Sequence, residues 1–449
     1  MEDDMDYSKL YKEKLISAKE AAKLVKDGDY VDYSWGVVSP HDFDEALAKE
    51  ISNLNDIVVR GGVELEKFKI FDADPTNEHF VYNSWHSLGP IRKLAGEGRA
   101  FYSPLKYSEL PKYYRTSIKK PNVFVTQACP MDEHGYFNFG VSASHLYAAI
   151  ENSDIVIIEV NKNVPRGLGG YENCVHIKEV DYIIEGSNPE MIALGKPQPS
   201  DLDKEVAKFV VEELVDGACL QIGIGGLPTA IGNEIANSDL KDLGVHTEMY
   251  VDSFVELSKA GKITGKKKNI DRGRQVYAFA AGSKELYDFI NNNEELCAAP
   301  VDYCNGIEQI SALDNFMSIN SALEVDLNGT VSAESSGTKH ISGSGGALDF
   351  MLGAYNSKGG KSFVTLHSSR VDKKGVRHSN IVPTLLQGTQ PTGCRANTHY
   401  VATEFGMVNL KGQSLWERTE KLISIAHPEF REELIKEAEK MRIWRKSNK

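Results

Sequence analysis

The feature that most constrains the fold is a series of short, continuous apolar runs rich in β-branched residues. Each run has the length of a strand, ends at polar or glycine residues, and does not alternate between apolar and polar positions. Such runs are typical of strands buried on both faces, so we expect mostly parallel sheets covered by helices. The runs are DIVVRGG (56–62), NVFVTQA (122–128), DIVIIEV (154–160), ACLQIGIGG (218–226) and SFVTLHS (362–368).

Stretches with helical periodicity separate these runs, for example PHDFDEALAKEISNL (40–54) and DLDKEVAKFVVEEL (201–214). The charged sequence from about residue 415 onward is also expected to be helical. The alternation of strands and helices predicts an α/β fold. In the second example the apolar residues recur on one helix face, namely Leu202, Val206, Phe209, Val210 and Leu214.

The chain has 449 residues, which is too long for one ordinary hydrophobic core, so two domains are expected. The segment SNPEMIALGKPQPSD (187–201) has three prolines and a glycine directly before a helix start, and we place the boundary there. The predicted domains are residues 1–199 and 200–449. Each half also contains a strand followed by a D-x-x-G turn, at 132–135 and 326–329, which suggests an internal duplication.

Charge and cysteine content limit the partners and the compartment. The net charge of −13 argues against general binding of nucleic acid or anionic membranes, although a local basic pocket would suffice for an anionic small ligand. The N-terminal sequence lacks the apolar segment of a signal peptide, and no run approaches the ~18 apolar residues of a membrane span. We therefore expect a cytoplasmic protein. Six cysteines without a C-x-x-C pair predict reduced thiols and no metal site: Cys129, Cys174, Cys219, Cys297, Cys304 and Cys394.

Two glycine-rich turns are candidates for ligand binding. QIGIGGLPTAIGNEIA (221–236) runs from an apolar strand through Gly223, Gly225 and Gly226 into a helix. Such a turn exposes backbone N–H groups to a ligand, but a tight structural turn is an equally good interpretation. HISGSGGALDFMLGA (340–354) leads directly into a helix, which favours a nest of backbone donors over a flexible linker.

Glu248 lies between these loops, in LGVHTEMYVDSFVELSKAGKITG (243–265). Taken alone, a glutamate in this position would be interpreted as a solvated surface charge. The run Lys266–Lys268 is interpreted in the same way, as exposed lysines.

Four motifs follow one another in the second half: QIGIGGLP (221–228), GVHTEMYVDS (244–253), NSALEVDLNGTVSAES (320–335) and SGSGGALDF (342–350). This order resembles the acetyl-CoA hydrolase/transferase family, a group of class I CoA-transferases, and within it the members that act on butyryl-CoA and acetate or on 4-hydroxybutyrate. The resemblance implies two open, mostly parallel-sheet α/β domains of CoA-transferase type with the active site between them. The likeness extends to GRAFYSPLKYSELP (98–111), CPMDEHGYFNFGVSASH (129–145) and VATEFGMVNLKGQSLWERTEKLISIAHPEFREEL (401–434).

The resemblance assigns the covalent nucleophile to Glu248, the glutamate of HTEM. A carboxylate is ionised at neutral pH without a neighbouring base, since the ordinary pKa of glutamate is about 4.3. CoA would act as a substrate and as a covalent glutamyl-CoA intermediate, with no permanently bound cofactor. Lys373, in RVDKKGVR (370–377), is either a partner for CoA or a solvated loop residue. The CoA site implied by the resemblance comprises Gly223, Ile224, Gly225, Gly226, Leu227, Leu323 and Gly346.

The family analogy places part of the carboxylate pocket on loops of the first domain, with candidates Val38, Ser39, Pro40, Gly140 and Val141. Trp85 and His86 are interpreted as a core aromatic residue and a satisfied histidine. His246, beside the nucleophile, either orients Glu248 or has a structural role.

The expected reaction is transfer of CoA between a short-chain acyl-CoA and a free carboxylate with ping-pong kinetics. Butyryl-CoA and acetate are favoured, and 4-hydroxybutyryl, propionyl and crotonyl groups stay open. The absence of a recognisable arginine clamp favours monocarboxylates. Two other functions are considered: an acyl-CoA hydrolase on the same fold, in which water resolves the thioester, and a non-catalytic CoA-binding protein. A homodimer or homotetramer is implied by the resemblance.

Overall fold

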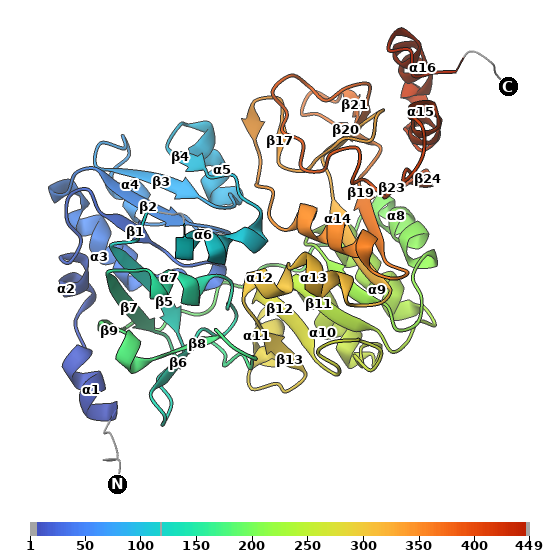
Figure 1. The fold of residues 1–449 in the computed structure, drawn as a ribbon. Coiled ribbons are helices and arrows are strands. Elements are labelled where there is room, and N and C mark those ends of the chain that lie inside the picture. The colour runs from blue at the N-terminus through green and yellow to red at the C-terminus, as the bar shows by residue number, and fades with distance from the viewer. Residues whose placement is uncertain (1–6, 117–118, 446–449) are drawn as a thin grey trace. The chain divides into compact units, whose positions relative to one another are not determined.

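The computed structural model describes residues 7–116 and 119–445 (Figure 1). The chain divides into two compact units. Unit 1 contains the chain through Gly195, together with Glu248–Tyr250 and Val276–Cys304. Unit 2 contains Lys196–Thr247, Val251–Gln275 and the chain from Asn305 onward. The chain first leaves unit 1 inside the segment that the sequence marks as a linker, and the domain division at residue 200 stays a prediction.

Unit 1 is built on a parallel sheet with the strand order β4-β3-β2-β1-β5-β7-β9. Buried residues of four helices pack on one face, in the same apolar core as Val31, Val59 and Ile157. The neighbouring positions Phe124, Val156 and Ile158 are also buried, so the strands are apolar on both faces, as predicted. The strands are β1 Tyr30–Asp32, β2 Ile57–Gly61, β3 Phe80–Ser84, β4 Ala100–Tyr102, β5 Val123–Ala128, β7 Ile155–Val160 and β9 Tyr182–Glu185.

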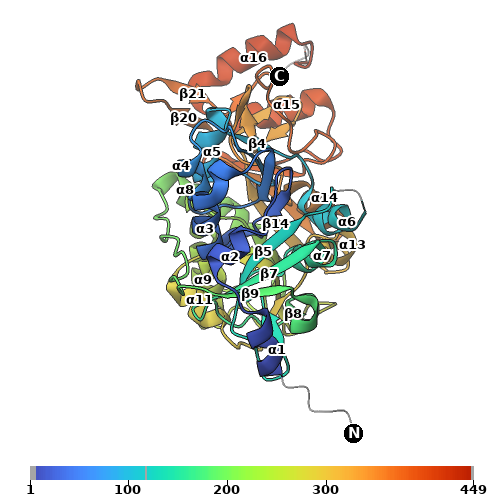
Figure 2. The same cartoon turned by 90° about the vertical axis from the view of Figure 1, so that its left-hand side faces the viewer.

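The helices of unit 1 are short, and Figure 2 shows α2 and α3 in front of the strands β5, β7 and β9. Helix α2 begins with a capping box, in which Ser17 accepts from the N–H of Glu20 and Glu20 accepts from the N–H of Ser17. The helices are α1 Tyr7–Lys14, α2 Ala18–Ala22, α3 Asp42–Glu50, α4 Ile70–Ala73, α5 Gly89–Gly96, α6 Leu110–Thr116 and α7 Leu146–Glu151, with 3-10 turns η1 Gly36–Val38, η2 Ile51–Asn53, η3 Tyr107–Glu109 and η4 Ile177–Glu179.

A later part of the chain completes unit 1. The segment that follows β6 (Tyr136–Asn138) pairs with β12 (Gln275–Ala280), because Ala143 N–H donates to Ala278 O and Ala280 N–H donates to Val141 O. Ala298 N–H likewise donates to Leu168 O. These pairings hold the predicted pocket residues Gly140 and Val141 in a buried loop. The remaining elements of this part are β8 Cys174–His176, α11 Lys284–Ile290, β13 Leu296–Ala298 and α12 Val301–Cys304.

Unit 2 contains strands in the order β11-β10-β14-β19-β23-β24, parallel except for the last pair. The apolar runs 218–226 and 362–368 form β10 and β19, and the predicted helices after residue 415 are present. The elements are α8 Asp201–Glu212, β10 Cys219–Ile222, α9 Gly226–Asn237, β11 Gly244–Tyr250, α10 Asp252–Lys259, α13 Ile307–Ser311, β14 Phe316–Ser321, α14 Ala347–Asn356, β19 Lys361–Thr365, β23 Tyr400–Thr403, β24 Gly406–Asn409, α15 Leu415–Ser424, η5 Pro428–Phe430 and α16 Arg431–Lys440.

Unit 2 also contains short strands between its main elements. They are β15 Glu324–Asp326, β16 Val331–Ser332, β17 Ser335–Ser336, β18 Lys339–His340, β20 Ser369–Val371, β21 Arg377–Ser379 and β22 Ile381–Val382.

The two sheets share a strand order. In unit 1 it runs β2-β1-β5-β7-β9 and in unit 2 it runs β11-β10-β14-β19-β23. In each, the first strand lies between the strand that follows it in the chain and a strand that comes later. The predicted D-x-x-G turns also match: Asp132 Oδ1 accepts from the N–H of His134 and Tyr136, and Asp326 Oδ1 accepts from the N–H of Asn328 and Thr330. Both likenesses support the internal duplication.

Each sheet therefore has a point where the strand order reverses, next to its first strand. In open α/β sheets, ligands bind at the carboxyl ends of the strands at this point. In unit 1 it lies between β1 and β5, and in unit 2 between β10 and β14. The loops that follow these four strands are thus the places to look for a site.

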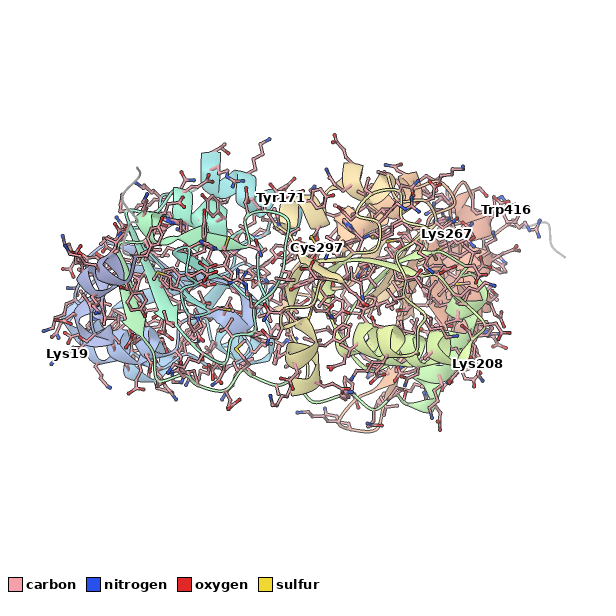
Figure 3. All side chains as sticks on the ribbon, turned by 90° about the horizontal axis from the view of Figure 1, so that it is seen from below. Lys19, Tyr171, Lys208, Lys267, Cys297 and Trp416 are labelled. Atoms are coloured by element: carbon pink, nitrogen blue, oxygen red, sulfur yellow. The ribbon has the colours of Figure 1, made fainter. Side chains whose placement is uncertain are left out.

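The interpretation of Lys266–Lys268 as exposed lysines is wrong for one of the three. Lys266 and Lys267 are exposed, and Lys267 is labelled in Figure 3. Lys268 is only 3% exposed, and its ammonium donates to Val245 O at 3.0 Å and Arg274 O at 2.7 Å. Two carbonyl acceptors make burial of this charge tolerable. Leu202, expected on the apolar face of its helix, is exposed at the first turn of α8.

Candidate active site

Glu248 lies near the end of β11, a strand that the sequence patterns had not indicated. Every other residue of β11 is buried, whereas Glu248 is partly exposed. Its contacts group it with unit 1. The local structure therefore presents one carboxylate at the end of an otherwise buried strand, just before α10 begins at Asp252.

Tyr107 is a unit 1 residue whose phenol is affected by the charge of this carboxylate. Burial raises the pKa of the Tyr107 phenol well above its ordinary value of 10, and the nearby charge of Glu248 raises it further. The phenol is therefore protonated at neutral pH. Its ring stacks on Trp35 with 4.3 Å between ring centroids, and it meets Phe279 edge-on with 6.0 Å between ring centroids. Aromatic rings therefore surround the ring of Tyr107.

Ser144 and His145 continue from Tyr107 as a line of polar groups. The Tyr107 Oη and Ser144 Oγ are 2.5 Å apart, and Ser144 Oγ is 3.0 Å from His145 Nδ1. Ser144 has a φ of 44°, a conformation uncommon for residues other than glycine. Burial lowers the pKa of His145 to about 3, with a smaller effect of the Arg60 charge, so the imidazole is neutral.

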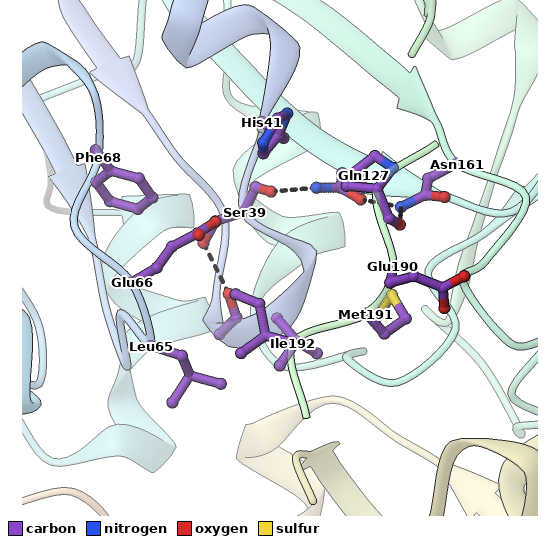
Figure 4. Close-up of a pocket in the computed structure, with 13 residues that line it drawn as sticks. Ser39, His41, Leu65, Glu66, Phe68, Gln127, Asn161, Glu190, Met191 and Ile192 are labelled. Carbon is purple, nitrogen blue, oxygen red and sulfur yellow. Dashed lines mark hydrogen bonds between the residues drawn. The ribbon is translucent and has the colours of Figure 1, made fainter. Parts of the chain in front are cut away.

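A cavity of about 100 Å³ opens at the reversal point of the unit 1 sheet (Figure 4). Its floor is polar: Gln127 Nε2 donates to Ser39 O at 2.7 Å, and Asn161 Nδ2 donates to Gln127 Oε1 at 2.8 Å. Val37, Leu65, Phe68, Met191 and Ile192 supply apolar walls.

Of the five residues proposed for the carboxylate pocket, only Ser39 lines this cavity. Val38 and Pro40 are its buried neighbours, and Gly140 and Val141 belong to the loop that pairs with β12. Trp85 is buried, in agreement with its interpretation as a core aromatic residue.

The first glycine loop occupies the reversal point of the unit 2 sheet. Gly223 N–H donates to Ile319 O at 3.2 Å, which joins the loop to the end of β14. Gly225 has φ 115° and ψ −176°, a region open almost only to glycine. Helix α9 begins at Gly226, and Ile224 is 48% exposed at the loop tip. The backbone N–H groups at this helix start form a natural anion site.

The other predicted CoA residues of unit 2 lie on neighbouring elements. Leu323 follows β14, the strand beside β10, and its N–H donates to Ser332 O. Gly346 caps the N-terminus of α14, which leads into the parallel strand β19 and so begins at the carboxyl edge of the sheet. Residues 223–227, Leu323 and Gly346 therefore gather at one edge. Lys373 is exposed at the turn of the β20–β21 hairpin, which follows β19.

Asp203 and His367 are two polar residues of unit 2 that the motifs did not single out. The Asp203 carboxylate accepts from Ser200 and lies 2.8 Å from His367 Nε2. A Cβ on Gly226 would come within 2.9 Å of Asp203 Oδ2. The absence of a side chain at Gly226 thus lets α8, the glycine loop and His367 pack against one another.

Known proteins share this architecture. A model of the acetyl-CoA hydrolase/transferase N-terminal domain matches residues 1–194, and a model of the C-terminal domain matches residues 282–438. The chain belongs to the acetyl-CoA hydrolase/transferase family. The two matches together cover more than half of the chain, and the motifs at 221–228 and 244–253 lie between them.

Individual members of the acetyl-CoA hydrolase/transferase family are similar over full length. The chain is 56% identical over 446 residues to the butyryl-CoA:acetate CoA-transferase of Anaerostipes caccae, covering 99% of this chain and 100% of that protein. It is 50% identical to the probable butyrate:acetyl-CoA coenzyme A-transferase of Syntrophomonas wolfei, covering 99% of both. The crystal structure of RipA from Yersinia pestis superposes with a TM-score of 0.89 at 33% identity, covering 98% of this chain and 100% of that one.

This family member is an enzyme of the CoA-transferase type that uses acyl-CoA substrates. In the described part of the chain, no cluster of three or more His, Cys, Asp or Glu side chains is arranged to hold a metal ion. None of the helices between residues 7 and 445, leaving aside 117–118, has the length and apolar character needed to cross a bilayer.

Three of these residues lie inside family segments of the sequence, although the sequence patterns did not identify them as candidates. Tyr107 lies in the segment 98–111 and Ser144 and His145 end the segment 129–145. These segments carried the likeness, but nothing in either pattern distinguishes a phenol that contacts the site from one that fills the core.

Proposed function

We propose that this enzyme transfers CoA from butyryl-CoA to acetate, releasing butyrate and acetyl-CoA. The observation that carries this proposal is the 56% identity over the full length of a butyryl-CoA:acetate CoA-transferase. Transfer to 4-hydroxybutyrate or propionate is the closest alternative. We expect the enzyme in the cytoplasm, as a homodimer or homotetramer.

In the proposed reaction Glu248 is the covalent nucleophile. Its carboxylate oxygen attacks the thioester carbon of butyryl-CoA, the C–S bond breaks, and a mixed anhydride and CoA thiolate form. The thiolate attacks the glutamyl carbonyl and butyrate leaves, so that CoA is held as a glutamyl thioester. Acetate then repeats both steps in reverse order and leaves as acetyl-CoA. No net proton or electron is transferred, and the energy of the thioester is retained.

CoA binding is assigned to the carboxyl edge of the unit 2 sheet. The N–H groups of residues 223–227 at the start of α9 are suited to an oxyanion or phosphate, because the helix dipole and the unpaired donors both favour negative charge. Leu323 and Gly346 are assigned to the same CoA site. For Lys373, an exposed hairpin position is compatible with both a phosphate partner and a solvated residue.

We assign the acyl group to the unit 1 cavity. An apolar cavity of about 150 Å³ accepts one benzene molecule, so a volume of about 100 Å³ is suited to an acyl chain of roughly four carbons. Among the described residues that line the cavity, none is lysine or arginine. A second carboxylate on the substrate would therefore meet no lysine or arginine and would share the cavity with Glu66 and Glu190, which favours monocarboxylates.

The dependence on a carboxylate acceptor tests transfer against hydrolysis. Butyryl-CoA consumption and free-thiol release are measured with and without acetate, and the assay is repeated with acyl-CoAs of two to five carbons. Transfer predicts acyl-CoA consumption that requires acetate, little free thiol, and a maximum at four carbons. Equal consumption and thiol release without any carboxylate would show an acyl-CoA hydrolase instead.

Replacement of the nucleophile tests the covalent mechanism. We expect Glu248→Ala and Glu248→Asp to abolish turnover while CoA still binds, measured by calorimetry. Mass spectrometry after incubation with butyryl-CoA alone should detect a CoA adduct on the unmodified enzyme and none on Glu248→Ala. Normal turnover by Glu248→Ala would exclude this mechanism.

A further inference from the structure

One face of the unit 1 sheet carries polar residues that the reaction described above does not use. Arg60 of β2 is in register with Asp32 of β1 and with Asn83 of β3. Tyr30 lies two residues before Asp32 in the same strand, so its side chain is on the same face. Val59, the neighbour of Arg60 in β2, packs into the apolar core on the opposite face. A patch of polar and aromatic side chains therefore lies on the second face of strands β1 to β3.

A cavity of about 460 Å³ opens over this patch. The volume falls in the range of roughly 300–1,000 Å³ that is typical of small-molecule sites. None of the described residues that line the cavity is acidic, and none of them lines the cavity assigned to the acyl group. The cavity is thus positively charged in a chain whose net charge is −13. Its aromatic lining residues are Tyr30, Trp85, Tyr102 and Tyr113, and its basic ones are Arg60 and Lys119.

The guanidinium of Arg60 is held in place but is not fully paired. Its Nε donates to Asp32 Oδ1 at 2.5 Å, and its Nη1 donates to the carbonyl of Lys119 at 3.0 Å. The second oxygen of Asp32 accepts from Tyr114 Oη at 2.6 Å, which fixes the carboxylate. The remaining nitrogen, Nη2, is buried and has no hydrogen-bond partner among the described residues. Buried N–H groups are nearly always paired, so an acceptor is missing at this position.

The ammonium of Lys119 adds a second positive charge beside the guanidinium. It lies 4.1 Å from the centroid of the Tyr30 ring, and the Arg60 guanidinium carbon lies 5.0 Å from the same centroid. The ring attracts both cations and keeps them near each other. Asp32 balances the charge of Arg60, whereas no carboxylate of the described residues pairs with Lys119. The cavity wall therefore carries one positive charge without a counter-ion.

We propose that this cavity binds a small anion that carries a planar ring, of the size of a nucleoside monophosphate. The anionic group pairs with Lys119 and supplies the acceptor that Arg60 lacks, since both cations bind phosphate and carboxylate oxygens. The planar ring stacks on the aromatic side chains of the lining. Acetate and butyrate have no ring and would leave most of the cavity empty. The inference concerns a site separate from the proposed reaction and does not depend on it.

Calorimetry with the full-length enzyme tests whether ring and charge are both required. The probes are AMP, phenylacetate, adenosine and inorganic phosphate. We expect AMP or phenylacetate to bind at one site, at least about 10-fold more tightly than adenosine or phosphate, because loss of one stacked ring alone costs about this factor. Tighter binding of AMP indicates a nucleotide, and tighter binding of phenylacetate indicates an aromatic carboxylate. The proposal is overturned if neither planar anion binds more tightly than both of the other probes.

Two neighbouring lysines provide a matched pair of variants. Lys119→Gln should weaken binding of the planar anion about 10-fold, as expected for loss of one charge-assisted contact. Lys120→Gln, whose ammonium pairs with Asp154 outside the cavity, should leave the affinity unchanged. Arg60 is retained in both, because its removal would leave the Asp32 carboxylate buried and unpaired. Unchanged affinity in Lys119→Gln, or an equal loss in both variants, would show that the anion binds elsewhere.

Competition with CoA separates this cavity from the substrate site. AMP has the adenine nucleotide character of part of CoA, so it is titrated again in the presence of saturating CoA, which no reaction consumes. We expect the affinity for AMP or phenylacetate to be unchanged, and Lys119→Gln to keep the kcat and the KM for butyryl-CoA of the natural enzyme. Displacement of the bound anion by CoA would place it in the substrate site and overturn the proposal, whatever residue is the nucleophile.

Discussion

At the scale of single residues, Glu64 shows how burial changes a carboxyl group. It is 1% exposed and accepts hydrogen bonds from Tyr82 Oη at 2.7 Å and Ser84 Oγ at 2.9 Å. Burial raises the pKa of Glu64 to about 7, and these hydrogen bonds only partly oppose the rise. The preceding residue, Val63, has a φ of 57°, which is rare for a β-branched side chain. The loop after β2 therefore contains both backbone strain and a buried acid.

Glu64→Gln is expected to gain stability relative to the natural protein as pH rises. The folded pKa of about 7 exceeds the ordinary 4.5, so the folded state holds the extra proton between these values and loses stability as pH rises through them. Glutamine has no proton to lose. The stability difference between the two proteins should therefore shift by on the order of 3 kcal/mol from pH 5 to pH 8.

Chemical denaturation at pH 5 and pH 8 measures this shift. Glu66→Gln, an exposed carboxyl group two residues along, serves as the control for a general effect of charge removal. A Glu64→Gln difference that is the same at both pH values would contradict the buried, protonated state of Glu64.

At the scale of elements, the loop between β10 and α9 depends on glycine at one particular position. Gly225 combines a φ of 115° with a ψ of −176°, whereas Gly223 has no positive φ, and a Cβ on it would meet only ordinary contacts of 3.8 Å and 4.0 Å. Gly225 is therefore required by its backbone conformation and Gly223 is not, although the two look alike in the motif. The start of α9 depends on the conformation of Gly225.

Gly225→Ala should weaken acyl-CoA binding, because a side chain at this φ costs about 1–3 kcal/mol of backbone strain and moves the N–H groups at the start of α9. We expect KM for butyryl-CoA to rise about 10-fold or more. Gly223→Ala, in the same loop, should raise it less than about 3-fold. Steady-state kinetics with saturating acetate compare the two, and equal effects would indicate that the loop conformation does not govern CoA binding.

At the scale of the whole molecule, one strand order occurs in both units, and in each the loops at the reversal point carry candidate binding residues, whereas Glu248 lies on β11. In unit 1 these are the residues after β1 and β5, and in unit 2 those after β10 and β14. The reaction proposed for the enzyme uses carboxylates and thiolates as nucleophiles, and these are already charged or are released within the cycle. It therefore requires neither ATP nor a metal ion.

Activity should survive removal of metal ions. We expect enzyme dialysed against EDTA to retain its full rate of CoA transfer, because the described residues offer no cluster of metal ligands and the covalent steps need no Lewis acid. Initial rates at varied butyryl-CoA and acetate should give parallel double-reciprocal lines, as the covalent intermediate requires. Restoration of lost activity by a divalent cation, or intersecting lines, would contradict the mechanism.

The sequence by itself determined the class of fold and the family. Continuous apolar runs such as 122–128 and 154–160 are strands β5 and β7, because strands buried on both faces lack polar alternation. Glycines followed by a helix indicated the loop before α9. The ordered motifs indicated the family, and with it the role proposed for Glu248.

Tertiary structure decided what depends on residues far apart in the chain. Tyr107 and Ser144 are separated by 37 residues, and Asp203 and His367 by 164, so no local pattern could show that they meet. Lys268 is buried with its ammonium donating to carbonyl groups 6 and 23 residues away, which its run of lysines does not indicate. Local propensity and periodicity report whether a residue faces a core, whereas hydrogen-bond partners and pKa are set by whatever the fold places beside it.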